Sequence, residues 1–137
     1  MKTRIYNIEE RLIDFVVQIL EIVENLPKTY VAQHQGSQLA RSGTSPAFNY
    51  GEAQSAESTK DFVHKMKICL KELRESQICM KIIAKKSYLD NQKLETVIKE
   101  NGELIAIFTS RIKTAMQNKT WHFYILHFVV LHFTLNK

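Results

Sequence analysis

The two cysteines are the residues of this 137-residue sequence best suited to nucleophilic chemistry. Cys69 and Cys79 are ten residues apart in one predicted helix, a separation of about 15 Å that exceeds the reach of a disulfide bond. We therefore expect two free thiols, which is typical of proteins in a reducing cytosol. Cys69 falls on the apolar face of that helix, where a thiol packs like a small hydrophobic side chain. Neither cysteine is predicted to be catalytic.

The histidines are not spaced for metal binding. His34 lies in a predicted connection and His64 on the outer face of a predicted helix, and neither has a ligand partner at helical spacing. Three more histidines recur every five residues, which places them on no common face of a helix. They are His122, His127 and His132. The sequence also lacks H-E-x-x-H, C-x-x-C, a glycine-rich phosphate loop and a nucleophile elbow. We expect no metal, no cofactor, no small-molecule substrate and no enzymatic activity.

A stripe of polar residues runs along the stretch QLARSGTSPAFNYGEAQSAE, residues 38–57. At about 100° per residue, six polar side chains fall in one helical arc roughly 100° wide, beside an arc of small and apolar residues. We call the polar arc the polar seam; it consists of Gln38, Arg41, Ser42, Ser45, Asn49 and Glu52. We expect the apolar arc to face a core and the seam to fix the register of a neighbouring subunit. Arg41 and Glu52 would neutralise one another within or between subunits. The alternative is a solvated face that makes no special contact.

Positive charge is concentrated in residues 58–86, which carry eight Lys or Arg and three acidic residues, a difference of +5 that equals the net charge of the whole chain. We call one flank of this predicted helix the basic stripe; it consists of Lys60, Lys67, Lys71, Arg74, Lys81 and Lys85. Such a stripe attracts phosphates, with an affinity that falls as salt rises. The alternative is a solvated outer face, which charge runs usually are. No aromatic residues alternate with the cations, so base stacking is not favoured.

Apolar residues at spacings of three and four predict four helices, at about residues 5–26, 33–56, 59–86 and 91–118. Pro27 ends the first helix, and Pro46 lies inside the second, which it should bend. Glycine and proline are scarce, with four and two residues, which disfavours a turn-rich β fold. Four amphipathic helices with short connections predict an all-α, up-and-down four-helix bundle over residues 1–119.

The tail over residues 120–137 differs from the rest because it is almost wholly apolar and aromatic, WHFYILHFVVLHFTLNK from Trp121 on. We expect it to cap the bundle, pack between subunits or remain loose. Its apolar run of about 15 residues is shorter than the roughly 20 that span a bilayer, so a membrane anchor is disfavoured. The start, MKTRIYNIEE, lacks the features of a signal peptide. We expect a cytoplasmic protein.

Residues 38–76, QLARSGTSPAFNYGEAQSAESTKDFVHKMKICLKELRES, resemble a known family. It comprises the four-helix-bundle proteins encoded in intervening sequences of bacterial large-subunit ribosomal RNA genes. The matching positions are Gln38, Leu39, Arg41, Ser42, Ser45, Asn49, Gly51, Glu52, Asp61, Phe62, Leu70, Glu72 and Leu73. The resemblance extends over about residues 8–119. It departs from the usual pattern at Pro46 and Tyr50, where isoleucine is common, and at Ala53, where glycine is common.

The resemblance implies a bundle that assembles into a ring, usually a pentamer. The family is also similar in fold to the accessory protein of diversity-generating retroelements, which binds a reverse transcriptase and nucleic acid. No catalytic residues are established for the family, so none is carried over. Two hypotheses follow: a non-enzymatic, self-assembling homo-oligomeric scaffold, or an accessory protein whose basic stripe contacts RNA, DNA or a nucleic-acid enzyme. The sequence names neither the process nor the partner.

Overall fold

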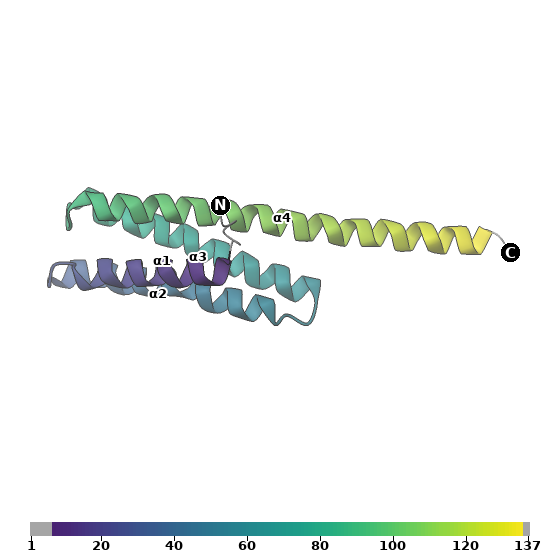
Figure 1. Cartoon of the computed structure of the whole chain (residues 1–137), viewed down its shortest axis with the longest axis horizontal. Coiled ribbons are helices and arrows are strands. Elements are labelled where there is room, and N and C mark those ends of the chain that lie inside the picture. Colours follow the sequence, from purple (N-terminus) through teal and green to yellow (C-terminus); the bar gives the residue numbers. More distant parts are fainter. Residues whose placement is uncertain (1–6, 136–137) are drawn as a thin grey trace, which may run out of the picture.

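The computed structural model of the chain describes residues 7–135, with the side chains of residues 91, 119–121 and 132–135 left aside. Four helices occupy this range: α1 (Ile8–Glu24), α2 (Tyr30–Gln54), α3 (Thr59–Lys85) and α4 (Asn91–Leu135). Successive helices run antiparallel and lie side by side (Figure 1). No strand occurs in the described range. The prediction of an all-α fold with four packed helices is confirmed.

Side-chain caps explain where three of the helices begin. The side-chain oxygens of Asn7, Thr29 and Ser58 accept hydrogen bonds from backbone amides three residues later, at 3.3, 3.3 and 3.0 Å. Such caps satisfy amides that have no partner within the helix. The predicted start of the second helix, at about residue 33, was too late because the cap at Thr29 starts α2 at Tyr30. His34 consequently lies within α2 rather than in a connection.

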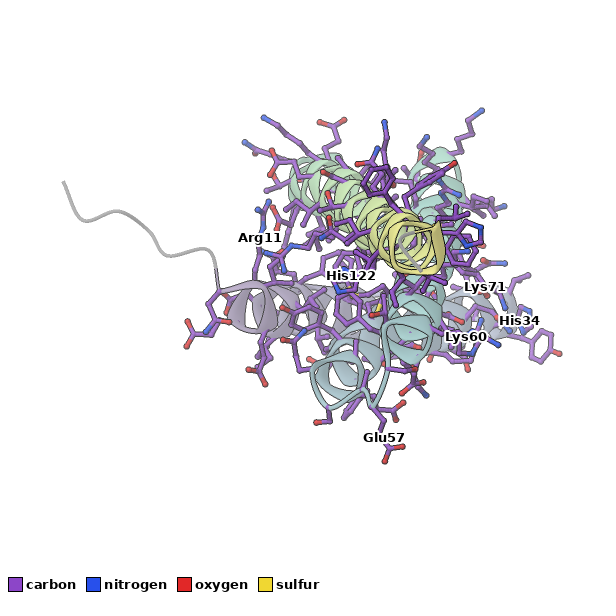
Figure 2. The ribbon with its side chains drawn as sticks, turned by 90° about the vertical axis from the view of Figure 1, so that its right-hand side faces the viewer. Arg11, His34, Glu57, Lys60, Lys71 and His122 are labelled. Carbon is purple, nitrogen blue, oxygen red and sulfur yellow. The ribbon has the colours of Figure 1, made fainter. Side chains whose placement is uncertain are left out.

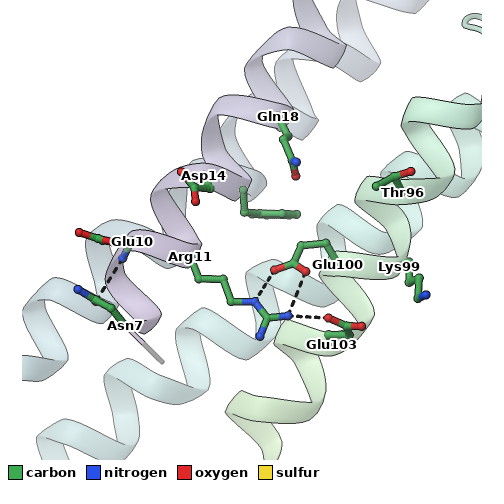
Figure 3. A pocket seen from close by; sticks show the side chains of 10 residues that line it. Asn7, Glu10, Arg11, Asp14, Gln18, Thr96, Lys99, Glu100 and Glu103 are labelled. Carbon is green, nitrogen blue, oxygen red and sulfur yellow. Dashed lines mark hydrogen bonds and ion pairs between the residues drawn. The ribbon is translucent and has the colours of Figure 1, made fainter. Parts of the chain in front are cut away.

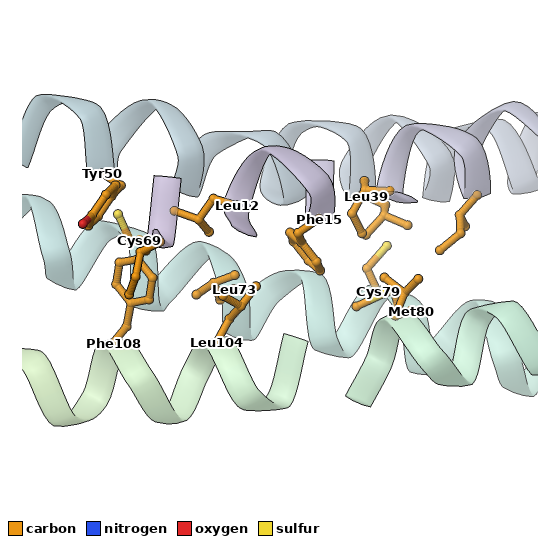
Figure 4. Close-up of a cluster of buried hydrophobic side chains, with 14 of the residues drawn as sticks. Leu12, Phe15, Leu39, Tyr50, Cys69, Leu73, Cys79, Met80, Leu104 and Phe108 are labelled. Atoms are coloured by element: carbon orange, nitrogen blue, oxygen red, sulfur yellow. The ribbon is translucent and has the colours of Figure 1, made fainter. Parts of the chain in front are cut away.

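Large apolar side chains from all four helices meet in one continuous core (Figure 4). The rings of Tyr50 and Phe108 pack edge to face with their centroids 5.9 Å apart. Three polar residues, Ser42, Ser76 and Asn101, are also fully buried. The largest fully buried side chains are Phe15, Phe108, Leu12, Ile19, Leu39, Met66, Leu73, Met80, Ile83, Leu94, Leu104 and Val97.

Two glycines of α2 let this helix approach α1 closely. A Cβ atom added at Gly43 would lie 2.7 Å from Cγ2 of Ile19, and one added at Gly36 would lie 2.9 Å from Cδ1 of Leu26. Both distances are too short for real carbon contacts. The terminal methyl of Leu26 can move aside, whereas the branched Ile19 side chain approaches Gly43 with its Cβ as well, so glycine is required at position 43 if α1 and α2 are to keep their separation. The small residues of α2 therefore set the distance between α1 and α2. The helix continues through Pro46 to its end at Gln54.

The fourth helix does not end near Asn118, as the sequence suggested, but continues to Leu135. The apolar seam of the bundle stops at Ile112, the last buried residue among the described side chains of α4. However, no glycine or proline follows Gly102, so nothing in the sequence stops the helix. This end of α4 projects beyond the connection between α2 and α3 (Figure 1). None of the helices, as far as they are described, has a stretch long and apolar enough to cross a membrane.

Candidate interaction surfaces

The polar seam of α2 faces α3 within the same chain. Ser42 is fully buried, and its hydroxyl lies 2.9 Å from that of Ser76 on α3. The Ser76 hydroxyl also lies 3.0 Å from the carbonyl oxygen of Glu72, one turn earlier in α3. A buried hydroxyl is costly unless it is hydrogen-bonded, so this pair favours one register of α2 against α3.

The charged seam residues also pair with α3. Arg41 donates to Glu72 at 3.2 Å and makes a second ion pair with Glu75. Glu52 accepts from Lys65 at 2.6 Å, and this hydrogen bond, with the attraction between the two charges, raises the pKa of Lys65. Arg41 and Glu52 therefore each have a partner on α3 rather than neutralising one another within the chain. The sequence analysis missed these partners, although two of the three acidic residues in 58–86, Glu72 and Glu75, lie about one helical turn apart, which was a signal for the partners of Arg41.

Among the described residues, the remaining seam residues form no hydrogen bond with α3. Asn49 donates to the backbone carbonyl of Ser45 at 3.0 Å and to its hydroxyl at 2.9 Å. Gln38 is exposed, as is about half of the Arg41 side chain (53%). The seam thus joins α2 to α3, and Gln38 and Arg41 remain accessible at the surface.

Both thiols lie in the same interface between α2 and α3. Cys69 Sγ is 3.5 Å from the carbonyl oxygen of Pro46, and Cys79 Sγ is 3.4 Å from that of Gln35. Burial raises the pKa of Cys69 to about 12 and also raises the pKa of Cys79. Because the thiolate is the reactive form, both groups are held in their unreactive state. Neither thiol is suited to act as a nucleophile.

The basic stripe lies on the exposed outer side of α3, and Lys60 and Lys71 are seen together on one side of the bundle in Figure 2. All six of its side chains are exposed, and none forms an ion pair with another described residue. Ile78 and Ile82 lie within the same outer face and are 63% and 41% exposed. The surface is therefore both cationic and partly apolar.

A polar pocket of about 620 Å³ separates α1 from α4 (Figure 3). Arg11 crosses it, donating to both carboxylate oxygens of Glu100 at 2.5 and 3.0 Å and to Glu103 at 2.6 Å. This pocket was not predicted from the sequence because its residues come from helices about 90 residues apart in the chain. The lining consists of Asn7, Glu10, Arg11, Asp14, Phe15, Gln18, Thr96, Lys99, Glu100 and Glu103.

The histidines of the described range are spread over the surface. His34 on α2 and His64 on α3 are exposed. His122 and His127 are exposed on α4, where the His127 ring stacks on Phe123 at 5.8 Å between centroids. The side chain of His132 is outside the described residues. Among the described residues, no three His, Cys, Asp or Glu side chains are placed to hold a metal ion.

These helices and contacts define the class of the protein as an all-α four-helix bundle in which polar side chains of α1 and α2 bind to other helices of the same chain. Residues 5–110 match the family described as 23S rRNA-intervening sequence protein, and the chain belongs to this family. A similar solved structure is the crystal structure of a protein with unknown function from the S23 ribosomal protein family of Bacteroides thetaiotaomicron. It has 28% sequence identity and a TM-score of 0.72, and the match covers 77% of this chain and 97% of that chain. No curated protein matches the chain.

Proposed function

We propose that the protein is a non-enzymatic scaffold that assembles with copies of itself. The observation that carries this proposal is an exposed apolar stripe on α1. Ile13, Val17 and Leu20 follow one another at spacings of four and three residues and are 49%, 49% and 40% exposed. At about 100° per residue they point roughly 150° away from the buried residues of α1. The outer face of a surface helix is normally polar, so this stripe is suited to a protein partner.

The partner proposed for this stripe is another copy of the chain, arranged in a ring. The resemblance to the ribosomal intervening-sequence proteins implies such rings, usually of five copies. A ring requires a head-to-tail interface in which two different surfaces of each copy meet. The polar seam supplies accessible polar groups, Gln38 and Arg41, for such a contact.

Val17→Glu tests the assembly, because a charge in a buried apolar interface is strongly destabilising. We expect light scattering to give a mass that is smaller than that of the unmodified protein by a factor equal to the number of copies in the ring. Val31→Glu is the matched control, since Val31 is 61% exposed on α2 and lies outside the α1 stripe. An unchanged mass for Val17→Glu, or an equal loss for Val31→Glu, would contradict the proposal.

A second candidate function, nucleic-acid binding, is favoured by the free cations of the basic stripe. Each phosphate contact contributes about 0.7 to 0.9 to the slope of log affinity against log salt. Replacing Lys67, Lys71 and Arg74 by glutamine should therefore reduce the slope by about 2 to 3 for a mixed-sequence RNA or DNA duplex. The control replaces three exposed lysines of α4: Lys93, Lys99 and Lys113. Equal slopes for the two triple variants, or no binding at low salt, would remove this candidate.

A further inference from the structure

The core-facing side of α4 continues past the end of the bundle. Within the bundle this side is marked by Phe108 and Ile112, which are buried. At about 100° per residue, three later large apolar residues with described side chains fall within about 60° of the same direction. They are Phe123, Leu126 and Val130, which are 68%, 61% and 56% exposed. The side of α4 that packs in the bundle is therefore repeated where α1, α2 and α3 no longer cover it.

We call α4 from Met116 to Leu135 the α4 extension; it is about 30 Å long at about 1.5 Å per residue. Its sequence has no Asp, Glu, Lys or Arg between Lys119 and Lys137. Every described side chain from Met116 onward is exposed. Eight large apolar side chains between Phe123 and Leu131 are 49–68% exposed. Monomeric soluble proteins rarely expose so many apolar side chains together, so the extension is suited to a partner. It has apolar residues on opposite sides, such as Tyr124 and Leu126, whereas a helix lying on a membrane surface needs one polar face.

We infer that a second copy of this chain pairs with the α4 extension, with the two extensions antiparallel. The direction follows from the position of the bundle. In each copy α1, α2 and α3 lie on the core-facing side of α4 (Figure 1). A parallel partner facing the same side would place its bundle in the volume occupied by the first bundle. An antiparallel partner places its bundle at the far end, and each extension fills the space beyond the other copy's connection between α2 and α3.

The size of this contact fits a specific dimer. The half-cylinder that one side of a helix about 30 Å long and about 10–12 Å wide presents has an area of roughly 470–570 Å², so a pair buries at most roughly 940–1,140 Å². This area is near the lower limit for stable interfaces. A mainly apolar pocket of about 360 Å³ lies at the base of the extension. In a pair whose two-fold axis passes near Leu126, the end of the partner's extension reaches this pocket, which adds to the interface. The pocket is lined by Leu70, Thr109, Ile112, Lys113, Met116 and Gln117.

The test compares Leu126→Glu with Tyr124→Glu in the full-length chain. The two side chains are similarly exposed, at 61% and 67%, but point about 160° apart on the helix. We expect Leu126→Glu to halve the mass measured by light scattering and Tyr124→Glu to leave it unchanged. Equal masses for all three proteins, or an equal loss in both variants, would overturn the inference. Circular dichroism confirms that the variants remain helical.

A crosslinking experiment tests the antiparallel geometry without introducing a charge. Leu126→Cys lies near the proposed two-fold axis and should form an intermolecular disulfide on mild oxidation, whereas Tyr124→Cys should not. The native thiols do not interfere because Cys69 and Cys79 are buried. No crosslink at position 126, together with sedimentation of the full-length protein with anionic phospholipid vesicles, would assign the extension to a membrane and overturn the inference.

The pairing of α4 extensions is independent of the ring proposed above. The masses of the variants distinguish the two assemblies. If both exist, Val17→Glu leaves a dimer and Leu126→Glu leaves a single ring. If the ring is absent, the unmodified chain is a dimer and Leu126→Glu is a monomer. If the pairing of extensions is absent, Leu126→Glu has the mass of the unmodified chain.

Discussion

The two sides of the bundle are built in different ways. Between α2 and its neighbours, small residues and satisfied polar groups hold the helices close together, with Gly43 against Ile19 and Ser42 against Ser76. Between α1 and α4 there is a pocket of about 620 Å³, bridged by Arg11. Polar residues occur on both sides. The difference shows that polar residues specify a close interface only where neighbouring residues are small enough to exclude solvent around them.

The largest expected difference between the two sides is in thiol reactivity. A pKa of about 12 for Cys69, against an ordinary value of 9.0, reduces the thiolate fraction at pH 8 about a thousandfold. Native Cys69 should therefore react with iodoacetamide at least that much more slowly than a cysteine introduced in the open pocket by Thr96→Cys. The raised pKa also predicts that labelling of Cys69 stays slow at pH 9 to 10. Similar labelling rates at positions 69 and 96, measured by mass spectrometry, would show that the interface between α2 and α3 is open to solvent.

The next largest effect is expected at the glycines of α2. Gly43→Ala should destabilise the protein by about 1–3 kcal/mol, because the new Cβ would overlap the stiff, branched side chain of Ile19. Gly51→Ala is the control, since a Cβ there has no atom within 4 Å, and it should stabilise the helix by about 0.5–1 kcal/mol. Urea unfolding measures both values. Stabilisation by both substitutions would mean that α1 and α2 are less closely packed than the structure indicates.

Removal of Arg41 should destabilise the protein by less than the upper value of about 3 kcal/mol expected for Gly43→Ala. Arg41→Gln leaves the carboxylate of Glu72, whose side chain is only 10% exposed, without its cation, at a cost of about 1–2 kcal/mol. Glu52→Gln breaks a pair with Lys65 in which the Glu52 side chain is 59% exposed, so its loss of stability should be smaller. Thermal unfolding of the two variants gives the difference. Equal losses of stability would indicate that Arg41 contributes no more by pairing with the buried Glu72 than Glu52 does by pairing with Lys65.

The smallest effect is expected at the open side. Arg11→Gln breaks the bridge across the pocket, but Glu100 and Glu103 are 25% and 53% exposed and can be solvated. We expect a loss of less than about 1 kcal/mol. Amide hydrogen exchange should become faster in α1 while α2 and α3 are unaffected, and Lys99→Gln in the same pocket is the control. Faster exchange across the whole bundle would show that the Arg11 bridge supports more than its own interface.

The helices themselves were predictable because their apolar residues repeat at the helical period. Buried positions such as Leu12, Leu73 and Phe108 fall in these repeats. The Ser58 cap was also predictable from its type and from Asp61 three residues later. Local patterns of this kind are encoded within a few residues, so a single sequence reveals them.

The contacts of the candidate surfaces were less predictable because they depend on helices that are distant in sequence. The seam was visible on α2, but its partners Glu72, Glu75 and Ser76 depend on the rotation of α3, which periodicity does not give. The end of α4 was misplaced for a different reason. Loss of the apolar seam marks where a bundle ends, whereas a helix ends only where its backbone is capped or broken. The α4 extension has neither signal before Leu135.

The short connections between successive helices have a consequence for the folding rate. Each of the pairs α1–α2, α2–α3 and α3–α4 closes a short loop, whereas contact between α1 and α4 requires the whole bundle to assemble. Chains dominated by such local contacts fold within about microseconds to milliseconds. We expect α2 and α3 to pair in the transition state and the α1–α4 side to close last. Ser76→Ala should then slow folding, whereas Glu100→Gln should mainly speed unfolding in stopped-flow experiments. The opposite pattern would place the nucleus on the open side, and the least packed interface would then be the first to form.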